Sequence, residues 1–248
     1  MKINKVPLGQ FVAKNPFSHP LTQGFFYREK MRAIHRISPE EKLENILEVG
    51  GGRSGLTAML YPNAKITNLD FNPEYAEVAC NQTENVTFVC GDATNLPFPN
   101  ESFDAITMFD VLEHIPDHQK AAAEALRVLR PGGYIMVSTP NENWRFPYYD
   151  FMRSFTPKDS DVMAEWGHVR RGYTRQEVED LIGFPCQVYA TFINPVTVLC
   201  HDVAFSHLSP LKRQLLCTAL SPITWTSYAL HKPESKGTET AYRWQKLA

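Results

Sequence analysis

The chain has 248 residues, with 25 Lys and Arg against 27 Asp and Glu and a formal net charge of -2. This length is enough to bury a full core, and it predicts one large α/β domain or a domain with insertions. The nearly balanced charge, without long runs of one sign, excludes a basic surface of the kind that binds nucleic acid. No stretch reaches the roughly 18 apolar residues of a membrane-spanning helix, and the first 20 residues have no continuous apolar core of the kind an export signal needs, so we expect neither.

The cysteines are scattered and odd in number, and they form no C-x-x-C pair. Their positions are Cys80, Cys90, Cys186, Cys200 and Cys217. This usage is typical of buried thiols in a reducing compartment. We therefore expect a cytoplasmic protein without disulfides, which at most touches a membrane surface.

The first 45 residues are expected to form a helical lead-in. Its apolar residues recur so that one helical face is largely apolar: Phe25, Phe26, Met31, Ile34 and Ile37. Ser38 and Pro39 interrupt this pattern. The lead-in is therefore expected to end just before the first strand.

Residues 46–57 have the pattern of a buried strand, a glycine turn and the start of a helix. Glycine allows the sharp turn and lets the backbone come close to a ligand. Gly50, Gly52 and Gly55, with Asp70 twenty residues after Gly50, also fit the dinucleotide pattern. Glu48 at the strand end favours a cationic cofactor over a pyrophosphate, whose charge it would repel. The turn alone leaves both cofactors open, and an ordinary glycine turn as well.

The rest of the chain alternates strands with helices. Strands are predicted at 65–69, 86–90, 103–109, 134–138, near 187–193 and at 238–246. Helices are predicted after Gly55, from Asn72 and Pro73, up to Arg130, and from the capping box of Thr174 and Glu177 to Gly183. This alternation indicates a parallel sheet with right-handed crossovers.

Two segments interrupt the alternation. Residues 141–173 are rich in aromatic side chains without a clear period, and residues 195–235 are apolar but contain three prolines. We interpret both as insertions on the acceptor side of a single domain, 1–248. The aromatic cluster at 144–155 is expected to form a substrate wall, with plain packing as the alternative.

Several blocks between residues 40 and 140 together resemble the class I S-adenosylmethionine-dependent methyltransferases, especially the quinone-biosynthesis (type 11) branch. Ser54 departs from the family pattern, which usually has glycine there. The resemblance decides against a dinucleotide and implies a Rossmann-like, doubly wound sheet whose seventh strand, 238–246, is antiparallel. Besides the glycine turn, the blocks are Asn68-Leu69-Asp70, Gly91-Asp92-Ala93, Phe98-Pro99 with Ser102-Phe103-Asp104, Asp110 to His114, and Leu126 to Gly133.

The resemblance also implies where S-adenosylmethionine binds. Glu48 and the backbone of Gly50, Gly51 and Gly52 would lie beside the methionyl amino group. Phe109, at the end of the 103–109 strand, would line the methionyl side. Because Ser54 stands where the family usually has glycine, we expect the loop that faces the methionyl group to differ slightly in shape from the family pattern.

Four further residues would hold the nucleoside by the same resemblance. Asp70 would bind the ribose hydroxyls, and Phe71 would pack beside the adenine. Asp92 would accept from the adenine amino group, and Ala93 would offer its backbone N–H. Asp70 and Asp92 also have an alternative interpretation as ordinary turn residues at strand ends.

Two histidines are candidates for a catalytic base. His114 follows the 103–109 strand, and imidazole titrates near neutrality, so it suits removal of a hydroxyl proton. Its alternative role is that of a loop or helix-cap residue. His168 is the second candidate, with an interface role as its alternative. His114 and His118 have the i, i+4 spacing of metal ligands, and some relatives bind a divalent ion at this block, but Pro116 between them disfavours one helical face. We predict no metal.

We expect the protein to be a methyltransferase that acts in small-molecule biosynthesis. The apolar insertions favour a hydrophobic or aromatic acceptor. The pair Glu113 and His114 resembles the oxygen-methylating quinone enzymes, and this resemblance favours oxygen as the methylated atom. Nitrogen or carbon methylation stays open, as does a cofactor-binding scaffold or a cyclase on the same fold. The sequence does not decide the acceptor or the oligomeric state.

Overall fold

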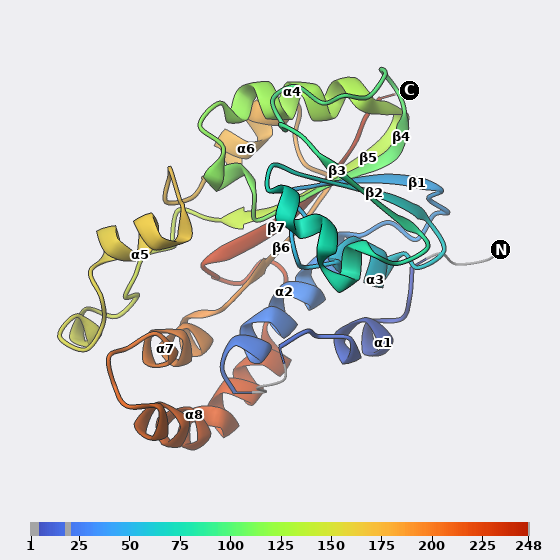
Figure 1. Ribbon diagram of the computed structural model, residues 1–248. Helices are drawn as coiled ribbons and strands as arrows, with labels where there is room; N and C mark the ends of the chain where they lie inside the picture. Colours follow the sequence, from blue (N-terminus) through green and yellow to red (C-terminus); the bar gives the residue numbers. More distant parts are fainter. Residues whose placement is uncertain (1–4, 18–20, 248) are drawn as a thin grey trace.

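The computed structural model describes residues 5–17 and 21–247, so parts of the expected lead-in, 1–4 and 18–20, lie outside the described residues. The described chain folds around one seven-stranded sheet in the order β3-β2-β1-β4-β5-β7-β6 (Figure 1). The strands are β1 (Asn45–Val49), β2 (Lys65–Asp70), β3 (Val86–Cys90), β4 (Phe103–Phe109), β5 (Leu129–Pro140), β6 (Val188–Phe192) and β7 (Glu239–Gln245).

Strands β1 to β5 pair in parallel, whereas β7 pairs antiparallel with both β5 and β6. The predicted doubly wound sheet with an antiparallel last strand is therefore confirmed. Strand β1 lies in the middle of the parallel part, and Ile46, Leu47 and Val49 on it are at most 1% exposed. A strand covered on both faces needs such a continuous apolar run.

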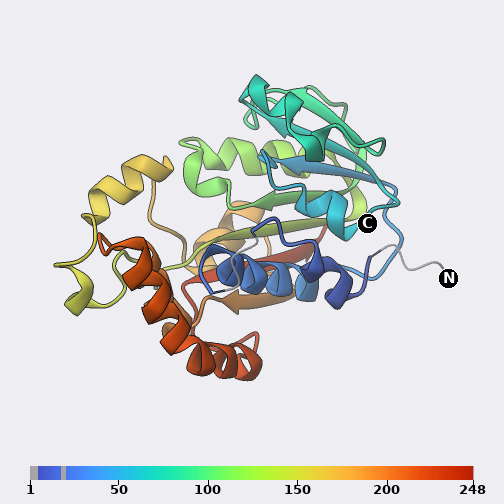
Figure 2. The same ribbon diagram turned by 60° about the horizontal axis from the view of Figure 1, so that its bottom comes forward.

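Helices cover both faces of the sheet (Figures 1 and 2). One face carries α4 (His118–Val128) and α6 (Arg175–Ile182), which pack into one apolar cluster. The other face carries α1 (Leu8–Ala13), α2 (Gln23–Ile37), α3 (Leu56–Leu60) and α7 (Pro195–Ala204) in a second cluster. The remaining helices are α5 (Asp159–Trp166), α8 (Pro210–Leu230) and the short 3-10 turns η1 (Pro73–Glu77), η2 (Ala79–Asn81), η3 (Leu112–His114) and η4 (Asp150–Met152).

The predicted capping box is present, because Thr174 accepts from the Glu177 backbone while the Glu177 carboxylate accepts from the Thr174 backbone. Asn72 caps a helical turn with Pro73 at its first position, as predicted, but this turn is the short 3-10 helix η1. One other local prediction was wrong. The prolyl-glycyl stretch 131–133 does not separate a helix from a strand, because α4 ends at Val128 and β5 already begins at Leu129.

The second insertion, residues 195–235, contains a proline that does not end a helix, although its sequence indicates an interruption there. Pro222 lies inside the 21-residue helix α8. A proline leaves the carbonyl four residues earlier without its helical donor. That carbonyl belongs to Thr218, and the Ser221 hydroxyl donates to it at 2.7 Å. The lost hydrogen bond is replaced locally, and the helix continues.

Candidate active site

The glycine turn connects β1 to α3 and has the backbone that its glycines predict. Gly50, Gly52 and Gly55 all have positive φ, at 69°, 50° and 57°. A Cβ on Gly50 would also lie 2.3 Å from the Val111 side chain, so a larger residue would clash there. Glycine is therefore required at position 50 both by conformation and by space.

Asp70, the last residue of β2, faces this turn. Its carboxylate accepts from the Gly52 N–H at 3.1 Å and from the Asn72 N–H at 3.1 Å. Burial raises the pKa of this carboxyl, and the backbone hydrogen bonds oppose that shift. The side chain thus holds the turn in place and lies against a cleft.

Asp92 and Phe71 lie at the rim of the same cleft. The Asp92 carboxylate accepts from the Thr94 N–H and the Thr94 hydroxyl, both at 2.8 Å, and these bonds lower its pKa. The Phe71 ring is 82% exposed. An apolar ring this exposed beside a cleft is a surface on which a flat ligand can pack.

The cleft has a volume of about 1130 Å³ and opens where β1, β2 and β4 end. One end, the glycine-turn end, is formed by residues 50–54 with Asp70, Phe71, Asp92 and Ala93. The other, the histidine end, is formed by Lys30, Asp110, His114 and Trp166, and Tyr27 lies between the two ends, near Ser54 of the turn as well as Lys30. Phe109 also lines the cleft. Among the residues proposed from the sequence, only Glu48 and His168 do not line it.

Glu48 lies beneath the glycine turn instead. It is 2% exposed, and its carboxylate accepts from the Thr57 N–H at 3.3 Å. A Cβ on Gly51 would lie 2.7 Å from the Glu48 side chain. Burial raises the pKa of the Glu48 carboxyl. In this structure Glu48 therefore connects β1 to the first turn of α3 and supports the loop from below.

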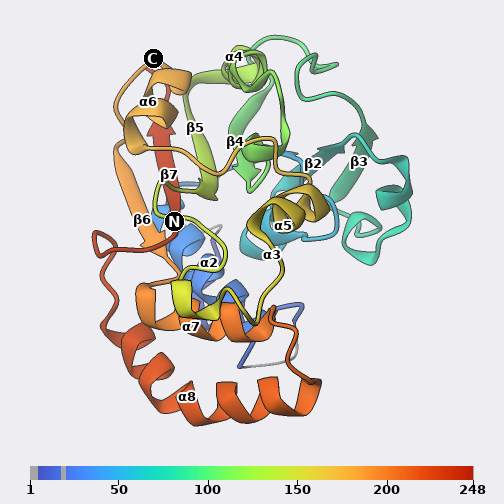
Figure 3. The ribbon, with the colours of Figure 1, turned by 90° about the vertical axis from the view of Figure 1, so that its left-hand side faces the viewer.

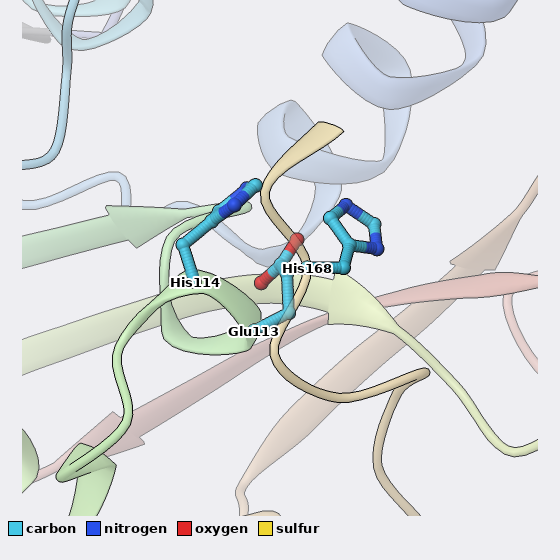
Figure 4. Close-up of side chains that lie close together, drawn as sticks. All are labelled: Glu113, His114 and His168. Atoms are coloured by element: carbon cyan, nitrogen blue, oxygen red, sulfur yellow. The ribbon is translucent and has the colours of Figure 1, made fainter. Parts of the chain in front are cut away.

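Figure 4 shows the three side chains that gather beside the histidine end, with the Glu113 carboxyl between the imidazoles of His114 and His168. The two histidine rings are 4.8 Å apart, and one ligand atom from each of the three residues lies within 4.8 Å of the others. Carboxylate and imidazole are donors that divalent metals use, so this set could hold an ion. The sequence pair His114 and His118 does not meet, because the His118 ring is hydrogen-bonded to the Tyr173 hydroxyl at 2.8 Å.

The three residues differ in their protonation. Burial, together with His114, lowers the pKa of His168 to about 4, and its Nδ1 has no hydrogen-bond partner. Burial and the Asp110 charge raise the pKa of Glu113 to about 8. His168 is therefore neutral at neutral pH, and Glu113 carries its proton.

His114 is held in one tautomer. Its Nδ1 lies 3.1 Å from the carbonyl oxygen of Gly167. A carbonyl can only accept, so Nδ1 carries the hydrogen of the neutral ring and Nε2 is left as the acceptor. The neutral imidazole is therefore set up to take a proton at Nε2.

Sequence reasoning missed one charged pair at the histidine end. Lys30, on α2, forms an ion pair with Asp110 at 2.5 Å, and Asp110 also accepts from the Ser138 hydroxyl. Burial alone would lower the pKa of Lys30, but the charges of Asp110 and Tyr27 outweigh it and raise that pKa. The only sequence signal was a lysine and a tyrosine three residues apart in the lead-in helix, and nothing in it indicates a partner 80 residues away.

The strand order is that of the class I methyltransferase fold, and the cleft lies at the strand ends, with one end at the glycine turn and the other polar and aromatic. The sequence comparison agrees. Residues 47–137 match the family model for a methyltransferase domain. This part of the chain is therefore similar to a methyltransferase domain, the class of domain for which S-adenosylmethionine is the expected methyl donor.

Two curated relatives match over longer stretches. The chain is 40% identical over 116 residues to the phthiotriol/phenolphthiotriol dimycocerosates methyltransferase of Mycobacterium leprae, covering 44% of this chain and 43% of that protein. It is 28% identical over 159 residues to the ubiquinone biosynthesis O-methyltransferase of Coxiella burnetii, covering 56% of this chain and 68% of that protein. The chain spans less than half the length of the mycobacterial relatives.

A solved structure shares the fold over nearly the whole chain. The N-methyltransferase NodS of Bradyrhizobium japonicum, in complex with S-adenosyl-L-homocysteine, has a TM-score of 0.58 and 16% identity. The alignment covers 97% of each chain. At this identity the likeness shows the fold alone.

Proposed function

We propose that this protein transfers the methyl group of S-adenosylmethionine to an oxygen of a small hydrophobic or aromatic acceptor. The observation that carries the proposal is the single cleft that joins a glycine-turn end, suited to the cofactor, to a histidine end with a tautomerically fixed imidazole. Bound there, S-adenosylmethionine supplies an electrophilic methyl group on a sulfonium. The chain's own residues then need to align the acceptor, remove its proton and exclude water.

The glycine-turn end fits the cofactor in shape and in donors. The carboxylate of Asp70 reaches the cleft at a strand end, the position from which it would hold the two ribose hydroxyls. The exposed ring of Phe71 offers a face for the adenine, and the neighbouring Asp92 and Ala93 offer an acceptor and a backbone donor. The Gly50 to Gly52 backbone would lie beside the methionyl group.

The histidine end supports a hydroxyl acceptor. His114 Nε2 is free to take a proton, because Nδ1 is occupied by the Gly167 carbonyl. The ammonium of Lys30 places a positive charge at the same end, where an oxygen becomes negative as its proton leaves. His168 is the alternative base, and it lies behind His114 rather than in the cleft.

The acceptor's hydrophobic character rests on two supports. Trp166 and Gly167, from the 141–173 insertion, line the histidine end, and Tyr27 and Phe17 line the cleft as well. The names of the relatives also describe methylation of phthiotriol dimycocerosates and O-methylation in ubiquinone biosynthesis. From the 141–173 insertion of the single domain, Trp166 and Gly167 are therefore the proposed acceptor wall, whereas the aromatic cluster at 144–155, expected as a substrate wall, does not line this cleft. Among the described residues, those of 195–235 do not line this cleft.

The location of the protein is part of the same proposal. We expect it in the cytoplasm, where its five free cysteines would stay reduced. None of its described helices combines the length and the apolar character needed to cross a bilayer. Small molecules, rather than nucleic acids, are the expected partners.

The test is to incubate the protein with methyl-labelled S-adenosylmethionine and hydrophobic extracts, and to search by mass spectrometry for labelled products. A methyltransferase forms S-adenosylhomocysteine in a one-to-one ratio with a labelled small molecule. A cyclase or a scaffold forms neither. The position of the label in the product distinguishes oxygen from nitrogen or carbon methylation, and label on nitrogen or carbon alone would refute the hydroxyl acceptor.

A further inference from the structure

Helix α8 has a large apolar surface that the described chain leaves uncovered. Its inner face packs on α7: Cys217 and Thr224 are buried, and their side chains contact Cys200. Figure 3 shows the outer side of α8 at the bottom edge of the molecule, with no other described segment beyond it. The exposed large apolar residues on this helix are Leu211, Leu215, Leu216, Ile223, Trp225 and Leu230, which are 37% to 74% exposed.

This surface is concentrated rather than scattered. Six of the thirteen exposed large apolar residues of the described chain lie on the 21 residues of α8. Single exposed apolar residues need no explanation, whereas a contiguous set marks a site of contact. The outer face contains hydroxyl groups and alanine between the apolar residues, as at Thr218, Ala219 and Thr226.

The charge beside this face is mainly positive. Helix α8 contains no Asp or Glu, and Lys212 and Arg213 lie in its first turn. Residues 205–236 contain four Lys and Arg against one Glu, a net charge of +3. The whole chain has a net charge of -2, so the rest of it has -5. An apolar helical face flanked by cations, on an otherwise acidic protein, is complementary to an anionic lipid surface.

The exposed surface of α8 also includes a hollow. A hollow of about 690 Å³ opens between the second half of α8 and the start of α7. Ile223 and Leu230 line it on the apolar side, and Lys236 lies at its edge. A hollow with this lining has room for part of an acyl chain, with an ammonium placed for the headgroup phosphate.

We propose that the outer face of α8, from Leu211 to Leu230 with Lys212, Lys232 and Lys236, docks on the surface of an anionic phospholipid bilayer. The helix lies in the interface and does not span it. A second copy of this chain is a poorer occupant, because a two-fold contact would bring the cationic patch against itself. The proposal concerns binding alone and does not depend on the acceptor.

The docking face is connected to the histidine end of the cleft through α2. Trp225 and Tyr228 of α8 pack edge-to-face on Phe25, at 4.9 and 5.6 Å between ring centres. The guanidinium of Arg32 donates to the Tyr228 carbonyl at 2.5 Å. The same helix presents Tyr27 and Lys30 to the cleft. If the proposed function holds, a lipid-dissolved acceptor would meet the enzyme from this side.

Sedimentation with vesicles tests the docking directly. The whole protein is mixed with phosphatidylcholine vesicles, with and without phosphatidylglycerol, in the absence of any methyl acceptor. We expect binding to the anionic vesicles that weakens as salt is added. Leu215→Glu and Ile223→Glu should each reduce it by about tenfold, because a charge replaces apolar area in the interface. Leu247→Glu is the matched control, since Leu247 is 84% exposed and outside α8.

Three outcomes would overturn the proposal. One is an absence of vesicle binding by the unmodified protein. Another is equal loss in Leu247→Glu and in the α8 variants. The third is a dimer, detected by light scattering, that Leu215→Glu converts to a monomer, because the face would then be a protein interface. Circular dichroism and thermal unfolding of each variant exclude misfolding as the cause, and methyl transfer enters none of these measurements.

Discussion

At the glycine-turn end of the cleft the shape is set mainly by backbone atoms and by side chains that hold neighbouring loops. At the histidine end it is set by pairs of side chains from distant segments. Asp70, for example, binds the N–H groups of Gly52 and Asn72, whereas Lys30 pairs with Asp110 and His114 lies against His168. The difference indicates that the first end is fixed by a compact strand-turn unit, and the second by how the helices pack.

This contrast predicts that variants at the two ends will affect different steps. Changes at the glycine-turn end should weaken cofactor binding. Changes at the histidine end should lower turnover or acceptor affinity while cofactor binding stays the same.

The largest effect is expected from His114→Ala. If Nε2 of His114 takes the acceptor proton, turnover should fall by roughly 10²- to 10⁴-fold because the loss falls on the transition state. Cofactor affinity, measured by calorimetry, should barely change. The rate should rise with pH through one ionisation in the unmodified protein and lose this limb in the variant.

His168→Asn is the matched control for that experiment. His168 contacts the His114 ring but does not line the cleft, and it is neutral at neutral pH because its pKa is lowered to about 4. We expect its turnover to stay within a few-fold of the unmodified protein. If His168→Asn lowered turnover more than His114→Ala, His168 would be the base.

The second effect concerns Asp70→Ala, which should weaken S-adenosylmethionine binding by roughly 10- to 100-fold. A carboxylate bonded to two hydroxyls loses two charge-assisted hydrogen bonds, and a loss of 10- to 100-fold corresponds to about 1.4–2.8 kcal/mol, since water takes over part of the bonding. The Gly52 and Asn72 N–H groups lose their partner as well. Asp92→Ala is the comparison, because it removes one cofactor bond and leaves the Ala93 backbone.

Calorimetric titration of both variants measures the difference. Equal affinities for the unmodified protein and Asp70→Ala would remove Asp70 from the cofactor site. If Asp92→Ala lost more cofactor affinity than Asp70→Ala, the main polar contact would be with the adenine rather than with the ribose.

The sequence predicted the first end well because its information is local. The strands 86–90 and 103–109 were predicted with the bounds that the structure has. Each is a short apolar or β-branched run closed by turn residues, and the pattern does not depend on distant partners. The glycine turn likewise needs positive φ at Gly50 and Gly52, which few other residues adopt.

At the second end the sequence indicated His114, His168 and the segment 141–173, but not the contacts that these residues make, because those contacts join distant parts of the sequence. Lys30 and Asp110 are 80 residues apart, and His114 and His168 are 54 apart. Neither spacing has a helical or strand period. Helix α8 was also not predicted to continue past Pro222. The Ser221 hydroxyl replaces the hydrogen bond that proline cannot donate, and helix propensities do not include such a side-chain contact.

The third effect sharpens the role of Lys30. Lys30→Met should reduce kcat/KM for the acceptor by about tenfold, because the cleft loses its positive charge beside the reacting oxygen. Cofactor affinity should not change. Lys14→Met, on an exposed lysine of the same lead-in, is the control.

Lys30 is also half of a partly buried ion pair, so its loss will destabilise the fold. The double variant Lys30→Met with Asp110→Asn separates the two roles, because it leaves no unpaired carboxylate. If stability returns while kcat/KM stays low, the ammonium acts on the acceptor. Recovery of both would limit Lys30 to a structural role.

The smallest effect is expected in the pH dependence of stability and concerns Glu29, on α2 between the sheet and α7. Burial raises its pKa to about 8, and neither carboxyl oxygen forms a hydrogen bond of normal geometry, although Thr197 lies close. The native state therefore holds the protonated acid. Stabilisation from this group is fully present below the unfolded-state pKa, about 4.3, and is lost as pH rises toward 8.

Glu29→Gln removes this titration while keeping the shape of the side chain. Between pH 5 and pH 9 the unfolding midpoint of the unmodified protein should fall further than that of the variant, because a difference of one unit between the folded and unfolded pKa values is worth about 1.4 kcal/mol and each kcal/mol shifts the midpoint of a chain this long by roughly 2–4 °C. Glu113 and Glu239 also have raised pKa values, but both proteins keep them, so the difference isolates Glu29. Glu165→Gln, on an exposed residue of α5, should leave the pH dependence unchanged. Parallel curves for Glu29→Gln and the unmodified protein would mean that Glu29 is ionised in the native state and that water or Arg32 reaches it.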